Sequence, residues 1–270
     1  MALVDDTPDW HVAAWQYPPR SLFDLSGRVA LVSGAASGLG RAIALGLDAF
    51  GARVILADRD AAGAAAVAAV LANSPVVVEV DVADPAQVAA MVDTALARCG
   101  RLDVGVLMPG TNVRKPALEL SDAEWQRVVD LNLTAMFRCA RAVGGVMVAQ
   151  GRGSMILMAS ARGLTGGRRQ SAYSASKAGV IGMMRCLAWE WAPQVRVNAL
   201  APGYMRTPLV QQIAGDAAWW QATVALHALG RVGRPEEIVG PAVFLASDAS
   251  SFVTGTVLTV DGGWTAGSPG

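Results

Sequence analysis

The chain has 270 residues, with 22 basic and 22 acidic side chains and therefore no formal net charge. This balance does not favour nucleic acid or an acidic membrane surface as a partner, and no apolar stretch reaches bilayer-spanning length. Three scattered cysteines and two histidines predict neither a disulfide framework nor a metal site. The first residues lack the basic and apolar pattern of a secretory signal, so we expect a cytoplasmic protein.

Apolar runs alternate with segments of helical spacing along most of the chain. Hydrophobic residues make up 53% of the sequence, which suits a parallel sheet buried on both faces. The predicted strands are Arg28–Ser33, Arg53–Ala57, Val76–Val80, Asp103–Leu107, Ser154–Ala159, Val195–Ala199 and Thr256–Val260. Predicted helices include Arg41–Phe50, Ala61–Ala72, Trp125–Gln150 and Ala172–Trp191. We therefore predict an α/β, Rossmann-type fold: a doubly wound, seven-stranded parallel sheet flanked by helices in a single domain.

Two segments stand outside this alternation. Residues 1–20 form a polar and aromatic arm, which is either a frayed terminus or a clamp onto a neighbouring subunit, and residues 21–270 form the domain. Within the domain, residues 207–230 are an insertion before the last helix.

A glycine-rich turn follows the first strand. Gly34, Gly38 and Gly40 lie between an apolar run and a helical segment. Glycines let the backbone approach a ligand closely, and a helix N-terminus offers free N–H groups to an anion. This order predicts a phosphate cradle for a dinucleotide.

Asp58 closes the second strand, at the distance where a carboxylate binds the adenosine ribose hydroxyls. The same carboxylate would repel a 2′-phosphate, which favours NAD over NADP. The neighbouring Arg59 is the opposing signal, because it could hold that phosphate.

Tyr173 and Lys177 are four residues apart, so on a helix they share one face. A free phenol has a pKa near 10. A fixed ammonium group favours the phenolate and would lower that pKa. The spacing therefore indicates a proton-transfer pair.

Together these features resemble the short-chain dehydrogenase/reductase family, from about Leu22 to Ala266. The resemblance implies hydride transfer between a nicotinamide cofactor and an alcohol or ketone. It implies that Tyr173 is the general acid/base, that Lys177 lowers its pKa and holds the nicotinamide ribose, and that Ser160 binds the reacting oxygen. Asn132 matches the asparagine that supports a proton-relay water.

The resemblance also implies a cofactor site and makes residues 207–230 a substrate lid. The expected cofactor contacts are Gly34, Ser37, Gly38, Leu39, Gly40, Asp58, Arg59, Asp81, Val82, Gly110, Tyr173, Lys177, Pro202, Gly203, Met205 and Thr207. One departure is clear. The family usually has Asn-Asn-Ala-Gly after the fourth strand, and this chain has Leu107-Met-Pro-Gly110. That change puts the polar ties of the loop and its contacts to the cofactor ribose in doubt.

The residues expected to contact the substrate include charged, polar and aromatic side chains. Arg162, Gln170 and Tyr204 are expected to line it, and Arg162 is the candidate partner of a carboxylate because arginine pairs with carboxylates through two hydrogen bonds. Several segments are similar to sugar-acid dehydrogenases such as gluconate 5-dehydrogenases. We therefore expect a polyol or sugar acid as substrate.

The sequence is also compatible with other substrates and with a protein that binds the cofactor without catalysis. A hydroxysteroid, a 3-ketoacyl thioester or another hydrophobic carbonyl would keep the chemistry and change the substrate. A cofactor-sensing binding protein would be expected to lose Tyr173 or Lys177. The family and the long apolar helices predict a homotetramer.

Overall fold

The computed structural model describes residues 19–267. Nearly all of the predicted N-terminal arm lies outside the described residues. Seven strands form one parallel sheet in the order β3-β2-β1-β4-β5-β6-β7. The strands are β1 Val29–Ser33, β2 Arg53–Asp58, β3 Val76–Glu79, β4 Val104–Leu107, β5 Gly153–Met158, β6 Val195–Pro202 and β7 Val257–Val260. All seven predicted strands are confirmed, and the largest difference is that β6 continues past Ala199.

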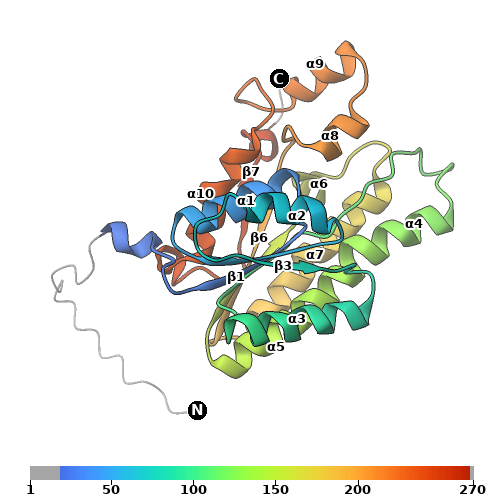
Figure 1. The fold of residues 1–270 in the computed structure, drawn as a ribbon. Coiled ribbons are helices and arrows are strands. Elements are labelled where there is room, and N and C mark those ends of the chain that lie inside the picture. The colour runs from blue at the N-terminus through green and yellow to red at the C-terminus, as the bar shows by residue number, and fades with distance from the viewer. Residues whose placement is uncertain (1–18, 268–270) are drawn as a thin grey trace, which may run out of the picture.

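Helices cover both faces of the sheet (Figure 1). The helices of one face are α1 Gly38–Ala49, α2 Ala61–Ala68 and α10 Val239–Ala246. Those of the other are α3 Pro85–Cys99, α4 Asp122–Val129, α5 Ala135–Gln150 and α7 Ser171–Glu190. The short helices α6 Ala161–Thr165, α8 Pro208–Ile213 and α9 Ala217–Ala225 lie near the carboxyl ends of the strands. This arrangement confirms the predicted doubly wound fold.

Three predicted helices differ in detail from the structure. Helix α1 begins at Gly38 rather than at Arg41. Helix α2 stops at Ala68, because the Asp48 carboxylate accepts hydrogen bonds from the backbone N–H groups of Ala72 and Asn73, at 2.9 Å each, and holds them out of the helix. The predicted helix Trp125–Gln150 begins earlier, at Asp122, where Ser121 and Glu124 cap each other. It also contains a π-helical turn, Asp130–Thr134, between α4 and α5.

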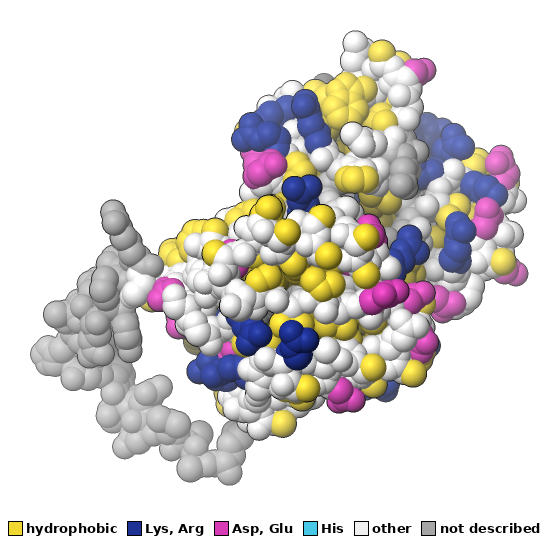
Figure 2. Space-filling model, in the orientation of Figure 1, with side chains coloured by type: hydrophobic (Ala, Val, Ile, Leu, Met, Phe, Trp, Pro, Cys, Tyr) yellow, Lys and Arg dark blue, Asp and Glu magenta, His cyan; other side chains and the backbone are white. Residues whose placement is uncertain are grey.

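Most buried apolar side chains form one core between the sheet and its helices. A second, smaller cluster lies beyond the carboxyl ends of the strands and centres on Ala161, Tyr204, Val232 and Trp264. On the face seen in Figure 2, basic and acidic side chains occur in separate groups rather than as one patch of a single sign. No helix within residues 19–267 has the length and apolar character needed to cross a membrane.

Candidate active site

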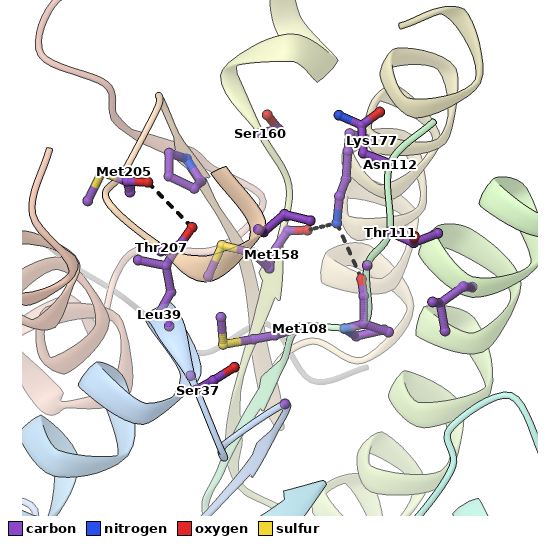
Figure 3. A pocket seen from close by; sticks show the side chains of 18 of the residues that line it. Ser37, Leu39, Met108, Thr111, Asn112, Met158, Ser160, Lys177, Met205 and Thr207 are labelled. Carbon is purple, nitrogen blue, oxygen red and sulfur yellow. Dashed lines mark hydrogen bonds between the residues drawn. The ribbon is translucent and has the colours of Figure 1, made fainter. Parts of the chain in front are cut away.

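A cleft of about 460 Å³ opens where the strands end (Figure 3). The order of the strands reverses between β1 and β4, and the loops on either side of such a point leave a crevice. Every residue predicted for the site lines this cleft except Asn132, which is buried behind it. The lining set is Gly34, Ser37, Gly38, Leu39, Gly40, Asp58, Arg59, Asp81, Val82, Gly110, Ser160, Arg162, Gln170, Tyr173, Lys177, Pro202, Gly203, Tyr204, Met205 and Thr207.

The glycine turn is built for close backbone approach. Gly34 and Gly38 have φ values of +72° and +54°, which favour glycine. A Cβ on Gly40 would collide with the carbonyl oxygen of Gly34. Ser37 makes no side-chain cap on α1, so the first N–H groups of that helix are left for an anion. These residues fit the pyrophosphate of a dinucleotide.

Asp58 is fixed at the end of β2. Its carboxylate accepts the N–H of Ala36, within the glycine turn, at 2.9 Å and that of Asp60 at 3.0 Å. These bonds tie the ribose-binding carboxylate predicted from the sequence to the phosphate cradle. Arg59 is exposed beside it and also lines the cleft.

Ser160 lies just after β5 and Tyr173 lies in the first turn of α7, and both line the cleft. Ser160 is the N-cap of α6, where its Oγ accepts the N–H of Arg162 at 3.2 Å. Burial raises the pKa of Tyr173, while a hydrogen bond with Ser160 and the positive charge of Arg162 act to lower it. Tyr173 is therefore protonated at neutral pH in the structure as it stands.

Lys177 is buried one helical turn after Tyr173. Its Nζ donates to the carbonyl oxygens of Met158, at 2.8 Å, and Pro109, at 3.4 Å (Figure 3). Burial lowers the pKa of this ammonium group to about 8. Nζ lies 6.0 Å from the centre of the Tyr173 ring.

The expected lowering of the Tyr173 pKa by Lys177 stays a prediction, because Lys177 is not among the groups that shift this pKa in the structure. The ammonium group is engaged by two carbonyl oxygens, and burial dominates, so the pKa of Tyr173 is raised rather than lowered. The cation that acts to lower it is Arg162.

Asn132 holds the loop after β4 from behind. Its Oδ1 accepts the N–H of Thr111 at 2.7 Å, and its Nδ2 donates to the Thr111 carbonyl and to Ser176 Oγ, both at 3.0 Å. The N–H of Met108 donates to Ser33 Oγ at 2.9 Å. The doubt about the polar ties of this loop is thus resolved, because its backbone groups are held without the side-chain amides of the usual motif.

An aromatic wall closes the far end of the cleft. Tyr204 stacks on Trp264, with ring centres 5.4 Å apart. His227 Nε2 accepts the N–H of Tyr204 at 3.2 Å, and Nδ1 lies 2.9 Å from the carbonyl oxygen of Thr223. A carbonyl can only accept, so Nδ1 carries the hydrogen of this contact. His227 thereby ties the segment after α9 to the end of β6.

Trp264, Asn112 and Met158 are among the residues that line the cleft and were not predicted from the sequence. Trp264 follows Asp261-Gly-Gly directly, and an aromatic residue there is a signal that could have been weighed. Met158 contributes a backbone carbonyl, which no side-chain pattern encodes.

The fold and the cleft define a dinucleotide-dependent oxidoreductase. A short-chain dehydrogenase family model, described as enoyl-(acyl carrier protein) reductase, matches residues 34–265. The chain is 43% identical to cis-4-hydroxycyclohexanecarboxylate dehydrogenase of Sinomonas cyclohexanicum, covering 88% of this chain and 97% of that protein. It is 40% identical to galactitol 2-dehydrogenase of Cereibacter sphaeroides, covering 91% and 98%.

Solved structures agree. A short-chain type dehydrogenase/reductase from Mycobacterium marinum has a TM-score of 0.86 and 38% identity, covering 92% of this chain and 99% of that one. The chain belongs to the short-chain dehydrogenase/reductase family. It is an NAD(P)-dependent oxidoreductase that acts on the CH–OH group of secondary alcohols. Its relatives include 2-dehydro-3-deoxy-D-gluconate 5-dehydrogenases, which confirms the resemblance to sugar-acid dehydrogenases.

Proposed function

We propose that the protein oxidises a small polar secondary alcohol, a polyol or a sugar acid, to its ketone with NAD. The observation that carries this proposal is the convergence of Ser160, Tyr173 and Lys177 on the cleft that also holds the glycine turn. Similarity to enzymes named for galactitol and for a hydroxycyclohexanecarboxylate supports the substrate class.

In this proposal each side chain has one task. A bound nicotinamide would supply the acceptor for the hydride that leaves the carbinol carbon. As that C–H bond breaks and the C=O bond forms, Tyr173 Oη, in its phenolate form, takes the hydroxyl proton; in the reverse direction the protonated phenol gives this proton to the carbonyl oxygen. Ser160 holds the reacting oxygen, and Lys177 positions the nicotinamide ribose. Asn132 fixes the loop beside Lys177 and would support a proton-relay water.

Absorbance of the reduced nicotinamide, followed with NAD and a panel of alcohols, tests this function. We expect turnover with at least one polyol or sugar acid. A cofactor-sensing protein would bind NAD and oxidise none of the panel, and that result would refute the proposed function.

We further propose that NAD is preferred over NADP. The fixed carboxylate of Asp58 supports this preference. Two solved relatives, 44% and 39% identical to this chain, hold NADP, so the preference is decided by measurement. Asp58→Asn should lower the ratio of kcat/KM for NAD over NADP by about tenfold or more, because it removes the charge that repels the 2′-phosphate. Equal or better use of NADP by the unsubstituted enzyme would show that Arg59 dominates.

We also propose a homotetramer. Large apolar side chains remain exposed on α4, α5 and α7, namely those of Trp125, Phe137, Val148 and Trp189. Burying such groups between subunits is favourable. Light scattering at micromolar concentration should give four times the chain mass of 27.9 kDa. A monomer mass would exclude the assembly.

A further inference from the structure

Three polar side chains on the substrate side of the cleft have buried atoms without a hydrogen-bond partner. They are Arg162 Nε, Gln170 Oε1 and Asn112 Oδ1. They come from α6, from the residue that precedes α7, and from the loop after β4, and all three residues line the cleft. Buried polar atoms in proteins are nearly always paired, so these three side chains are not satisfied by the rest of the described chain, and their remaining N–H groups are available to a ligand in the cleft that they line.

Gln170 is the most enclosed of the three, at 2% exposed. Gln170 is the N-cap of α7. The residue before it, Arg169, has a left-handed φ of +62°, which is unusual for a residue other than glycine. This turn brings the carboxamide to the cleft just before Tyr173. No described residue hydrogen-bonds the side chain of Gln170 or Asn112. A free carboxamide offers both a donor and an acceptor, which matches a hydroxyl group.

Arg162 is held rigidly while most of its N–H groups stay free. Its Cζ lies 4.3 Å from the centre of a Trp264 ring. On Gly167, a Cβ would come within 2.8 Å of the same Cζ, so glycine there makes room for the guanidinium. One nitrogen donates to the Gly166 carbonyl at 2.7 Å. None of the ion pairs among residues 19–267 involves Arg162.

An unpaired, preorganised guanidinium beside a reacting centre is suited to an anion, and a planar carboxylate fits its fork. The charge of Arg162 is felt at Tyr173, which places it near the reacting oxygen. The nearby carboxamides suit hydroxyls. A steroid has too few polar groups to pair with all three side chains, and an alditol offers the guanidinium hydroxyl oxygens but no negative charge.

We propose that Arg162, Gln170 and Asn112 form a subsite for a polyhydroxy carboxylate: the guanidinium pairs with the carboxylate and the two amides bind substrate hydroxyls. Trp264 forms the support behind the guanidinium. This inference rests on the proposed dehydrogenase function and narrows it from polyols and sugar acids to sugar acids.

The test compares an aldonate with the alditol of the same carbon chain, using NAD and NADP. The unsubstituted enzyme should prefer the aldonate. Arg162→Met keeps the bulk and removes the charge, so the ratio of kcat/KM for aldonate over alditol should fall about ten- to a hundredfold. Any effect of Arg162 on Tyr173 acts on both substrates and cancels in this ratio. Arg168→Met, at an exposed arginine of the same loop, should leave the ratio unchanged.

Gln170→Leu should lower kcat/KM for both substrates, because both carry hydroxyls. Melting temperature and NAD affinity show whether each variant is folded, and Arg162→Lys, which keeps the charge but loses the fork, should give a smaller fall than Arg162→Met. If the unsubstituted enzyme oxidises no alcohol with either cofactor, the proposed function fails. If it oxidises alcohols but Arg162→Met and Arg162→Lys leave the ratio unchanged, or if it prefers the alditol, only the sugar-acid subsite fails.

Discussion

Tyr173→Phe is expected to lose about a hundred- to ten-thousandfold in turnover, the contribution typical of a positioned general acid or base. Only the oxygen is removed. The ring is retained, and so is the Lys177 ammonium, which is bonded to the Met158 and Pro109 carbonyls rather than to the phenol. The fold and the affinity for NAD should therefore change little, as melting and titration of the cofactor would show.

The neighbouring serine provides a matched control for that variant. Ser174 Oγ is buried without a partner and does not line the cleft. Ser174→Ala also removes a single hydroxyl from the first turn of α7, and it should keep both turnover and stability. If Tyr173→Phe retained more than a tenth of the original turnover, another group would have to move the proton.

The strands could be predicted from sequence because each is short, apolar and bounded by polar or glycine residues. Burial on both faces leaves β4 and the first four residues of β1 without polar side chains, so their apolar runs are continuous. Most of the site followed, because it lies where these strands end. Gly34 and Asp58 are found by counting from a strand, and the structure places them on one cleft.

What the sequence could not supply depends on contacts between distant segments. Trp264 lies on Arg162 because the chain after β7 returns across the cleft. The carbonyl groups that hold Lys177 belong to Met158 and Pro109, whose side chains carry no such signal. The π-helical turn that contains Asn132 was missed because its residues fit an ordinary helix equally well.

In the loop after β4, contacts between distant segments change what the sequence motif alone suggests. The sequence has an unusual motif there, which put the polar contacts of the loop and its contacts to the cofactor ribose in doubt. The structure shows that Asn132 and Ser33 hold the backbone of Thr111 and Met108. Pro109 lacks an N–H, yet its carbonyl is one of the two that accept from Lys177. The missing amides therefore matter less than the sequence suggests.

Lys177→Met should lower turnover by at least about a hundredfold, if Lys177 assists the proton transfer made by Tyr173. It should also weaken cofactor binding, because the proposed ribose contact is lost. The variant should also differ in its free energy of unfolding, because it removes the buried charge of Lys177. In the folded chain the pKa of Lys177 falls from 10.5 to about 8. That difference corresponds to about 3 kcal/mol of cost for the buried charge near neutral pH.

The sign of the pH dependence follows from proton counting. Between about pH 8 and 10.5 the folded chain has released a proton that the unfolded chain still holds, so stability rises with pH across this window. Below pH 8 both states are protonated and the cost is constant. The free energy of unfolding of the unsubstituted protein, minus that of Lys177→Met, should therefore be flat near pH 7 and rise above pH 8.

Urea unfolding from pH 7 to 9.5 would measure this difference. The range ends below pH 10, where the buried phenol of Tyr173, whose pKa is raised, begins to contribute with the opposite sign. The variant leaves the Met158 and Pro109 carbonyls unpaired. This changes its free energy of unfolding by the same amount at every pH, so the pH dependence of the difference is unaffected. Lys115→Met, at the other lysine of the chain and on the surface, should show no rise in this range. A flat difference for Lys177→Met would mean that its ammonium keeps an ordinary pKa, and the hydrogen bonds to the two carbonyls would then offset the cost of burying the charge.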